Sequence, residues 1–328
     1  MALFGARLLI PMEPWFGDIS DFPPTVLNEF TTQSDMVLRG IPNFHGSYYW
    51  SHNPTLWAKG GGDPNNIPTT WDELIALAPE FLAKGVKPSV QPWLGTDGGF
   101  ATFYFKQMYN SFNVPFLSAD RTQALFGGPE GMAVFTTISN GLKNGYWDNT
   151  TLNIGNEHDA FTLFAQGKYA AIVDGTDNPK TGLNSSNYVV GVMPGMKAGT
   201  TGSVNGDDGL GISKFSAQQD ASKSFLQTMY SIPVAKQIAV ATPEIYGSPR
   251  ISLQNYPPLV AIETNPTAQV IAAQSAGPSS LWSAPYNYAP VFDDVMSKLV
   301  KGTYSSPQQA LDAAVKGVQG LIITYLSA

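Results

Sequence analysis

The residues best placed to do chemistry are two pairs of adjacent carboxylates, Asp207-Asp208 and Asp293-Asp294. A glycosidase needs two carboxylates that face each other across a cleft. In an extended chain, neighbouring side chains point to opposite sides, so neither pair supplies an acid and a base by itself. The serine in the segment 202–206 (GSVNG) also lacks the spacing of a nucleophile elbow. These residues do not predict an enzyme.

Aromatic residues in polar, loop-like surroundings indicate binding instead. They occur in Tyr48-Tyr49-Trp50, at Trp93, at Trp282 and in Tyr286-Asn287-Tyr288. Carbohydrate sites combine flat aromatic faces, which cover the C–H faces of a sugar, with amides and carboxylates that bind its hydroxyls. The alternative is that these aromatic residues are half-buried and anchor loops.

Composition narrows the class of protein further. A chain of 328 residues is long enough for two lobes or domains. Its net charge of −7, without any basic run, argues against nucleic acid and anionic membranes as partners. The charged fraction of 13% is low, which suits a protein that works outside the cytoplasm. Cysteine is absent and His45, His52 and His158 are scattered, so we expect no metal site and no cofactor.

Helical signals alternate with short apolar runs along the chain. The segment 70–73 (TWDE) is a capping box, and the apolar spacing after it predicts one helix that ends at Gly85. Ser306 and Pro307 are typical of the first positions of a final helix. Further helices are predicted around Phe135, from near Ser216, from Pro233 and from Pro290, with strands at 37–42, 169–173, 188–192 and 210–212. This alternation indicates an α/β architecture.

Several segments resemble, in order, those of a known family. Gly40-Ile41-Pro42 is followed by the segment 48–53 (YYWSHN) and by a helix start at 68–73 (PTTWDE). Further matching segments follow at 161–177, 191–194, 206–213, 221–230, 247–250 and 302–314. Together they resemble extracellular solute-binding protein family 1 of ABC transporters, the maltose-binding-protein-like sugar-binding proteins.

The resemblance implies a periplasmic-binding-protein-like fold of type II, in which two α/β lobes are joined by a hinge of crossing strands. Residues 1–54 and 209–255 are expected to form the N-terminal lobe, and residues 55–206 and 258–328 the C-terminal lobe. The opening strands and helices of full family members have no counterpart before Leu8. We therefore expect an incomplete N-terminal lobe, and no signal peptide is recognisable in the first residues.

The resemblance also implies a non-enzymatic function outside the cytoplasm. A mono- or oligosaccharide is expected to bind in the cleft between the lobes and to be delivered to the permease subunits of an ABC transporter. Membrane contact is expected only through the permease or through an N-terminal anchor. The alternatives are a binder of another solute such as a polyol or peptide, a carbohydrate-active enzyme on the same scaffold, and a truncated fragment that does not bind.

The predicted ligand contacts are the polar and aromatic residues that the resemblance places near the cleft. They are His45, Ser47, Trp50, Trp93, Phe100, Asp177, Asp207, Asp208, Arg250, Trp282, Tyr286 and Tyr288. Asp177 stands where the family usually has a tryptophan, and we expect it to accept a hydrogen bond from a sugar hydroxyl. Arg250 offers a planar fork to a hydroxyl or to Asp208; the alternative is a surface ion pair. Asp207 and Asp208 are equally compatible with simple turn formation.

Overall fold

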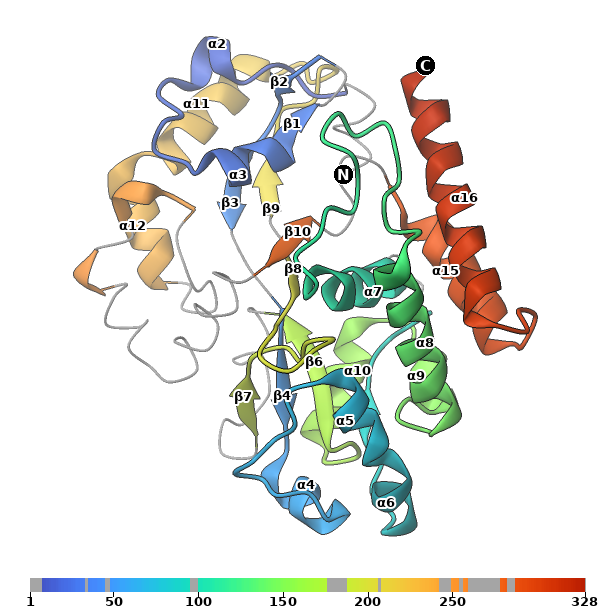
Figure 1. Ribbon diagram of the computed structural model, residues 1–328. Coiled ribbons are helices and arrows are strands. Elements are labelled where there is room, and N and C mark those ends of the chain that lie inside the picture. Colours follow the sequence, from blue (N-terminus) through green and yellow to red (C-terminus); the bar gives the residue numbers. More distant parts are fainter. Residues whose placement is uncertain are drawn as a thin grey trace.

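The computed structural model describes residues 8–32, 35–44, 48–94, 100–175, 188–205, 208–241, 249–253, 256–258, 278–281 and 287–327. Figure 1 shows two groups of elements that meet near the centre of the molecule. The small group consists of the described residues within 8–44 and 208–258. The large group consists of those within 48–205 and 278–327.

The small group packs short elements around its own apolar core. Its elements are α2 (Glu13–Phe16), α3 (Pro24–Leu27), the 3-10 helix η1 (Asn28–Phe30), β1 (Thr31–Thr32), β2 (Val37–Leu38), β3 (Ile41–Phe44), β9 (Asp208–Leu210), α11 (Gln219–Met229), α12 (Ile232–Ala241) and η3 (Ile251–Leu253). Met12, Phe22, Ile41 and Leu226 are among the residues of one buried cluster. Tyr230 donates its hydroxyl proton to the Ile41 carbonyl oxygen 2.8 Å away. The core therefore joins parts of the chain that are far apart in sequence.

A mixed sheet forms the centre of the large group. Its strands β5 (Ser89–Val90), β6 (Ala171–Gly175), β4 (Tyr48–His52) and β7 (Val189–Gly191) lie in that order. β4 pairs antiparallel with both of its neighbours, so that His52 lies opposite Ala171 on one side and Val189 on the other. Residues 49–52 are all buried. A strand covered on both faces does not alternate between apolar and polar residues, and β4 accordingly has aromatic side chains on both faces, with Ser51 between Trp50 and His52.

Helices cover this sheet and extend away from it. They are α4 (Pro54–Gly60), α5 (Trp71–Ala76), α6 (Ala78–Ala83), α7 (Phe100–Asn110), α8 (Pro129–Lys143), α9 (Asn149–Leu152), α10 (Glu157–Ala165), α15 (Ala289–Val300) and α16 (Pro307–Leu326). Figure 1 shows α15 and α16, in red, side by side along one edge, next to α8. The remaining strands β8 (Ser203–Asn205) and β10 (Ser279–Leu281) pair in parallel beside α7.

The predicted helix ends are confirmed where the signals are local. Thr70 accepts from the Glu73 amide while Glu73 accepts from the Thr70 amide, which is the predicted capping box. The helix after it differs from the prediction, because α5 ends at Ala76 and α6 begins at Ala78. Pro79 explains this division: a proline has no N–H for the interior of a helix but is tolerated in its first turn. Ser306 caps α16 as predicted, with Pro307 in the first turn.

Helix α7 was not predicted from the sequence pattern. Residues 101–110 are all buried, the polar Thr102, Lys106, Gln107 and Asn110 included, so its polar residues do not mark a solvent-exposed face. It even carries Lys106, which is 2% exposed and lies 4.8 Å from the centre of the Phe116 ring. Burial lowers the pKa of Lys106 to about 7, and the charge of Glu29 opposes this shift. The helix is therefore a central element of the large group, not a surface element.

The pairing of strand β4 differs from what the predicted lobe boundary implies. The predicted boundary follows residue 54 and assigns β4 to the N-terminal lobe. In the structure β4 pairs with β6 and β7 of the large group, and Trp50 belongs to the apolar core of that group. A boundary between β3 and β4 fits this pairing better. The division into two lobes itself stays a prediction.

Candidate functional site

The chain passes between the two groups along strands that lie side by side. β3 leads into β4, and β8 leads into β9, so each pair of strands joins the two groups. β3 pairs antiparallel with β9 in the small group. In the large group, Ser203 of β8 uses its hydroxyl to bind both backbone groups of Tyr48: it accepts from the amide at 3.0 Å and donates to the carbonyl at 2.9 Å. Ser203 therefore ties β8 to the start of β4 on the large-group side of the junction.

Aromatic side chains surround the start of β4 next to this junction. The ring of Tyr48 meets the ring of Phe103 edge-on at 3.8 Å between centroids. Phe100, the first residue of α7, stacks on Tyr104 at 6.4 Å and 24°. Tyr48 and Phe100 are half-buried, whereas Phe103 and Tyr104 are buried. Among the predicted contacts whose side chains the structure describes, Phe100 is the one that is only partly buried. Tyr48 is an aromatic neighbour that the prediction passed over in favour of Trp50.

Three other predicted aromatic contacts are packed inside the large group. Trp93 is 0% exposed and lies between Trp147, at 4.9 Å, and Tyr104, at 4.8 Å. Trp50 is 2% exposed and Tyr288 is 0% exposed. A sugar stacks on a free ring face, and these rings are covered by protein atoms. The structure therefore corrects the prediction for Trp50, Trp93 and Tyr288: they are buried core residues, neither sugar contacts nor the half-buried loop anchors of the alternative.

The side chain of Arg250 binds other residues of the protein. It is 8% exposed, pairs with Asp21 at 2.5 Å and donates to the Tyr230 carbonyl. Its guanidinium also lies 4.7 Å from the centre of the Phe22 ring. Burial raises the pKa of Asp21, but hydrogen bonds from Ser252 and Arg250 outweigh it and hold that pKa below its usual value. Arg250 belongs to a buried ion pair of the small group. It is therefore neither a sugar contact nor part of a surface ion pair.

Several predicted contacts cannot be compared with the structure. His45, Ser47, Asp177, Asp207, Trp282 and Tyr286 lie outside the described residues. Of Asp208, the backbone is described: it begins β9 and lies opposite Phe44 of β3. Their roles as ligand contacts stay predictions.

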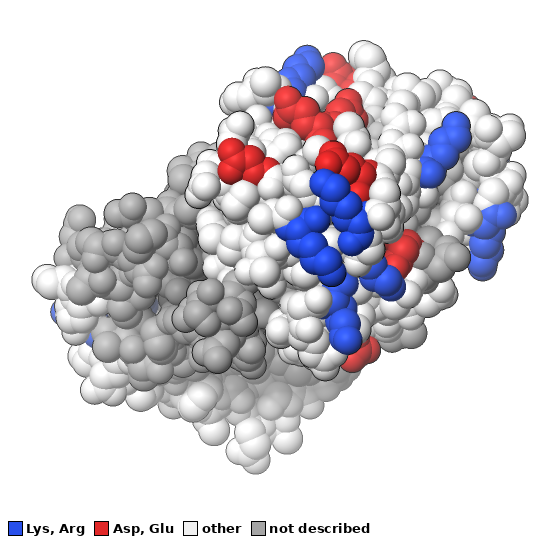
Figure 2. Space-filling view, turned by 90° about the horizontal axis from the view of Figure 1, so that it is seen from below, with Lys and Arg blue, Asp and Glu red and all other residues white. Residues whose placement is uncertain are grey.

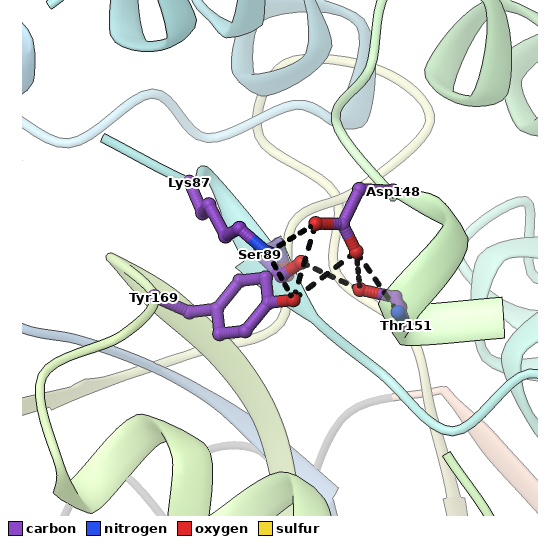
Figure 3. A network of polar contacts seen from close by, with 5 residues as sticks. All are labelled: Lys87, Ser89, Asp148, Thr151 and Tyr169. Carbon is purple, nitrogen blue, oxygen red and sulfur yellow. Dashed lines mark hydrogen bonds and ion pairs between the residues drawn. The ribbon is translucent and has the colours of Figure 1, made fainter. Parts of the chain in front are cut away.

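A second cluster of titratable groups lies in the large group (Figure 3). Asp148 pairs with Lys87 at 2.8 Å and accepts hydrogen bonds from the Tyr169 hydroxyl and from the amide and hydroxyl of Thr151. Burial raises the pKa of Asp148, yet the hydrogen bonds from Lys87 and Thr151 lower it overall. Asp148 also caps α9. Because these groups bind one another, the cluster fastens α9 to the segments before β5 and β6.

Charged side chains gather at the end of the large group that lies lowest in Figure 1. Figure 2 shows this face, on which Lys and Arg side chains form a band with Asp and Glu side chains beside them. Pairs such as Lys84 with Glu80, at 2.7 Å, mix the two signs. Within the described ranges, no three His, Cys, Asp or Glu residues are grouped to hold a metal ion. The same ranges contain no helix with the length and apolar character of a membrane span.

Comparison with known proteins decides the family. The sequence profile of the bacterial extracellular solute-binding proteins matches residues 12–236. The chain belongs to this family. Its members are solute-binding proteins of ABC transporters, and they bind their solutes without transforming them. The family resemblance of the sequence is therefore confirmed, as is the prediction that the protein is not an enzyme.

Curated relatives of this solute-binding protein match over a short stretch. Probable sugar-binding periplasmic proteins of Brucella suis biovar 1 and Brucella melitensis biotype 1 are each 35% identical over 74 residues. This match covers 21% of the chain and 17% of each relative's length.

Solved structures match over nearly the whole chain. The cyclic alpha-maltosyl-1,6-maltose binding protein of Arthrobacter globiformis has a TM-score of 0.74 at 21% identity, with 96% of this chain and 80% of that chain covered. A solute-binding protein of Thermotoga lettingae bound to alpha-D-tagatose has a TM-score of 0.78 at 19% identity, with 98% and 82% covered. UgpB of Mycobacterium tuberculosis, bound to glycerophosphocholine, has a TM-score of 0.74 at 18% identity, with 97% and 80% covered. The solute-binding protein therefore has the predicted periplasmic-binding-protein fold.

Proposed function

We propose that this solute-binding protein binds a mono- or oligosaccharide between its small and large groups and delivers it to the membrane subunits of an ABC importer. The geometry of the junction is the observation that carries the proposal. β3 pairs with β9, Ser203 of β8 binds Tyr48 of β4, and partly buried aromatic residues lie beside these strands at Tyr48 and Phe100. An aromatic face next to a hinge is suited to hold a sugar ring as the hinge closes.

The two groups then act as the two lobes. The described residues within 8–44 and 208–258 form one lobe, and those within 48–205 and 278–327 form the other. Each lobe has its own apolar core, since the cluster around Met12 and Leu226 is separate from the cluster around Trp93 and Phe292. Lobes with separate cores can rotate as rigid bodies about a few connecting residues.

The structural neighbours support a carbohydrate as the solute. Their bound or named ligands include cyclic maltosyl-maltose, tagatose, maltose and laminaribiose. One neighbour favours a second candidate, because UgpB is bound to glycerophosphocholine, a polyol derivative. A polyol carries hydroxyl groups, as a sugar does, but it has no ring that could stack on an aromatic side chain.

Isothermal titration calorimetry separates these candidates. We expect saturable heat with at least one of maltose, laminaribiose and tagatose, and none with glycerophosphocholine. Saturable heat with glycerophosphocholine alone would show that the solute is the polyol derivative and not a sugar. The absence of saturable heat with all four solutes would overturn the proposal.

The variant Phe100→Ala tests whether the ring of Phe100 contacts the sugar. An aromatic contact worth about 1 kcal/mol corresponds to about a fivefold loss of affinity for the sugar. The matched control is Phe215→Ala, because Phe215 is 74% exposed and lies in the small group. The control variant is expected to bind the sugar as the unchanged protein does. Equal affinities of both variants would exclude Phe100 from the sugar site.

A further inference from the structure

A cavity of about 510 Å³ lies within the large group, over one face of β4. Its described lining comes from β4, from the loop at 64–69, from β7 with its continuation to Pro194, and from residues 199–201. No residue of the small group is among these. The described lining therefore belongs to the large group alone.

The size and lining of this cavity are those of a small-molecule site. Ligand pockets have volumes of roughly 300–1,000 Å³ and are mostly apolar, with a few fixed polar groups. Ile67, Pro68, Met193 and Pro194 contribute apolar walls. No Asp, Glu, Lys or Arg is among the described lining residues. Val189 and Val192 of the lining are about half exposed, so the pocket opens to solvent. An uncharged molecule suits its apolar walls, because no charged side chain among the described lining residues could pair with a charged one.

His52 is the exceptional polar group of this lining. Its side chain is 2% exposed, and neither Nδ1 nor Nε2 makes a hydrogen bond with the described residues. Burial lowers the pKa of His52 to about 4, and the Pro64 backbone offsets this effect only in part. At neutral pH the imidazole is uncharged, so one nitrogen is a donor and the other an acceptor. A buried group in this state gains from any ligand that can pair with it.

The imidazole is held in place by its neighbours. The ring of Trp50 stacks on it at 5.2 Å and 23°, and Trp57 meets it at 5.7 Å. The backbone of His52 is fixed between β6 and β7. By contrast, the nearby hydroxyls of Thr200 and Thr201 already donate to the carbonyls of Lys197 and Met193. His52 is thus a preorganised polar group in an apolar cavity.

We propose that this cavity is a second ligand site, which binds an uncharged molecule with an apolar body and one hydroxyl group. The apolar walls take the body of the molecule, and the hydroxyl pairs with the imidazole of His52. A hydroxyl fits because it can accept from one tautomer of the imidazole or donate to the other. The site is independent of the sugar site, so both ligands bind at once.

The test uses p-cresol and toluene, which share a ring and a methyl group and differ in the hydroxyl. Titrations followed by the ¹⁵N resonances of the His52 imidazole report contact at the nitrogens directly. We expect p-cresol to bind and to shift these resonances, and toluene to bind about tenfold more weakly, because it leaves the imidazole unpaired. Equal affinities for the two ligands, or saturation by p-cresol without a shift at His52, would overturn the proposal.

Two variants complete the test. His52→Phe keeps a ring of similar shape and removes both nitrogens, so the preference for p-cresol over toluene should vanish while the melting temperature stays equal or rises. Val192→Trp leaves His52 intact and adds bulk at a half-exposed position of the lining, which should weaken both ligands. Calorimetry with the sugar is the control and should be unchanged in both variants. A retained preference for p-cresol in His52→Phe would contradict the assignment, whatever the outcome for the sugar.

Discussion

Replacing Trp93 by alanine is expected to lower the free energy of unfolding by about 3–5 kcal/mol. The side chain is 0% exposed and packs against Trp147 and Tyr104. Its removal leaves a cavity among large rings that are fixed by other contacts and cannot collapse into the space. Chemical denaturation followed by circular dichroism measures the change as a shift of the midpoint.

The same variant distinguishes a core residue from a ligand contact. The control is Phe215→Ala, at a residue 74% exposed, which should change the free energy of unfolding by less than about 0.5 kcal/mol. If Trp93→Ala were as stable as this control and had lost sugar binding, Trp93 would be the stacking platform that the sequence predicted. A stable variant of that kind would also show that the packing around Trp93 in the structure is incorrect.

Replacing Arg250 by methionine is expected to destabilise the small group by about 3–5 kcal/mol, because it leaves the partly buried Asp21 without its cation. The Tyr230 carbonyl loses a donor as well. Hydrogen exchange read by mass spectrometry should show faster exchange in peptides from residues 8–32 and 219–241 than in peptides from α7 and α8. Uniform exchange in both regions would contradict a role confined to the small group.

Lys298→Met is the matched control for Arg250→Met. Lys298 pairs with Asp294 at 2.6 Å, but both side chains are about half exposed, and such surface pairs contribute about 0–1 kcal/mol.

The loss of stability in Arg250→Met should also depend on pH. The pKa of Asp21 is lowered by folding, so its contribution is present above the ordinary value of 3.8 and is lost as pH falls below it. Acid should therefore narrow the stability difference between Arg250→Met and the unchanged protein.

The parts of the fold that the sequence predicts are those set by local chemistry. Thr70 and Glu73 form a capping box because both partners lie within one turn, and Ser306 caps α16 for the same reason. Helix α7 escapes prediction because tertiary packing buries it on all sides. The division between α5 and α6 was missed because the apolar spacing continues through Pro79 although the hydrogen bonds do not.

The candidate site is less predictable than the fold, because its residues are defined by distant partners. Trp93 stands between Pro92 and Leu94 in a loop-like segment, yet its burial depends on Trp147 and on α7. Arg250 pairs with Asp21, which lies 229 positions away in the sequence. Sequence reasoning identified exposed aromatic residues by their polar neighbours in the chain. The structure shows that neighbours in space decide which ring is covered, and Phe100 is only partly buried.

Small-angle X-ray scattering with and without a saturating sugar tests the central claim most directly, that a sugar binds between the two groups and draws them together. The sugar is the one that gives saturable heat in calorimetry. We predict a smaller radius of gyration in its presence and no change with p-cresol, whose proposed site lies within one group. Identical scattering curves at a sugar concentration that saturates the protein would contradict binding between the groups.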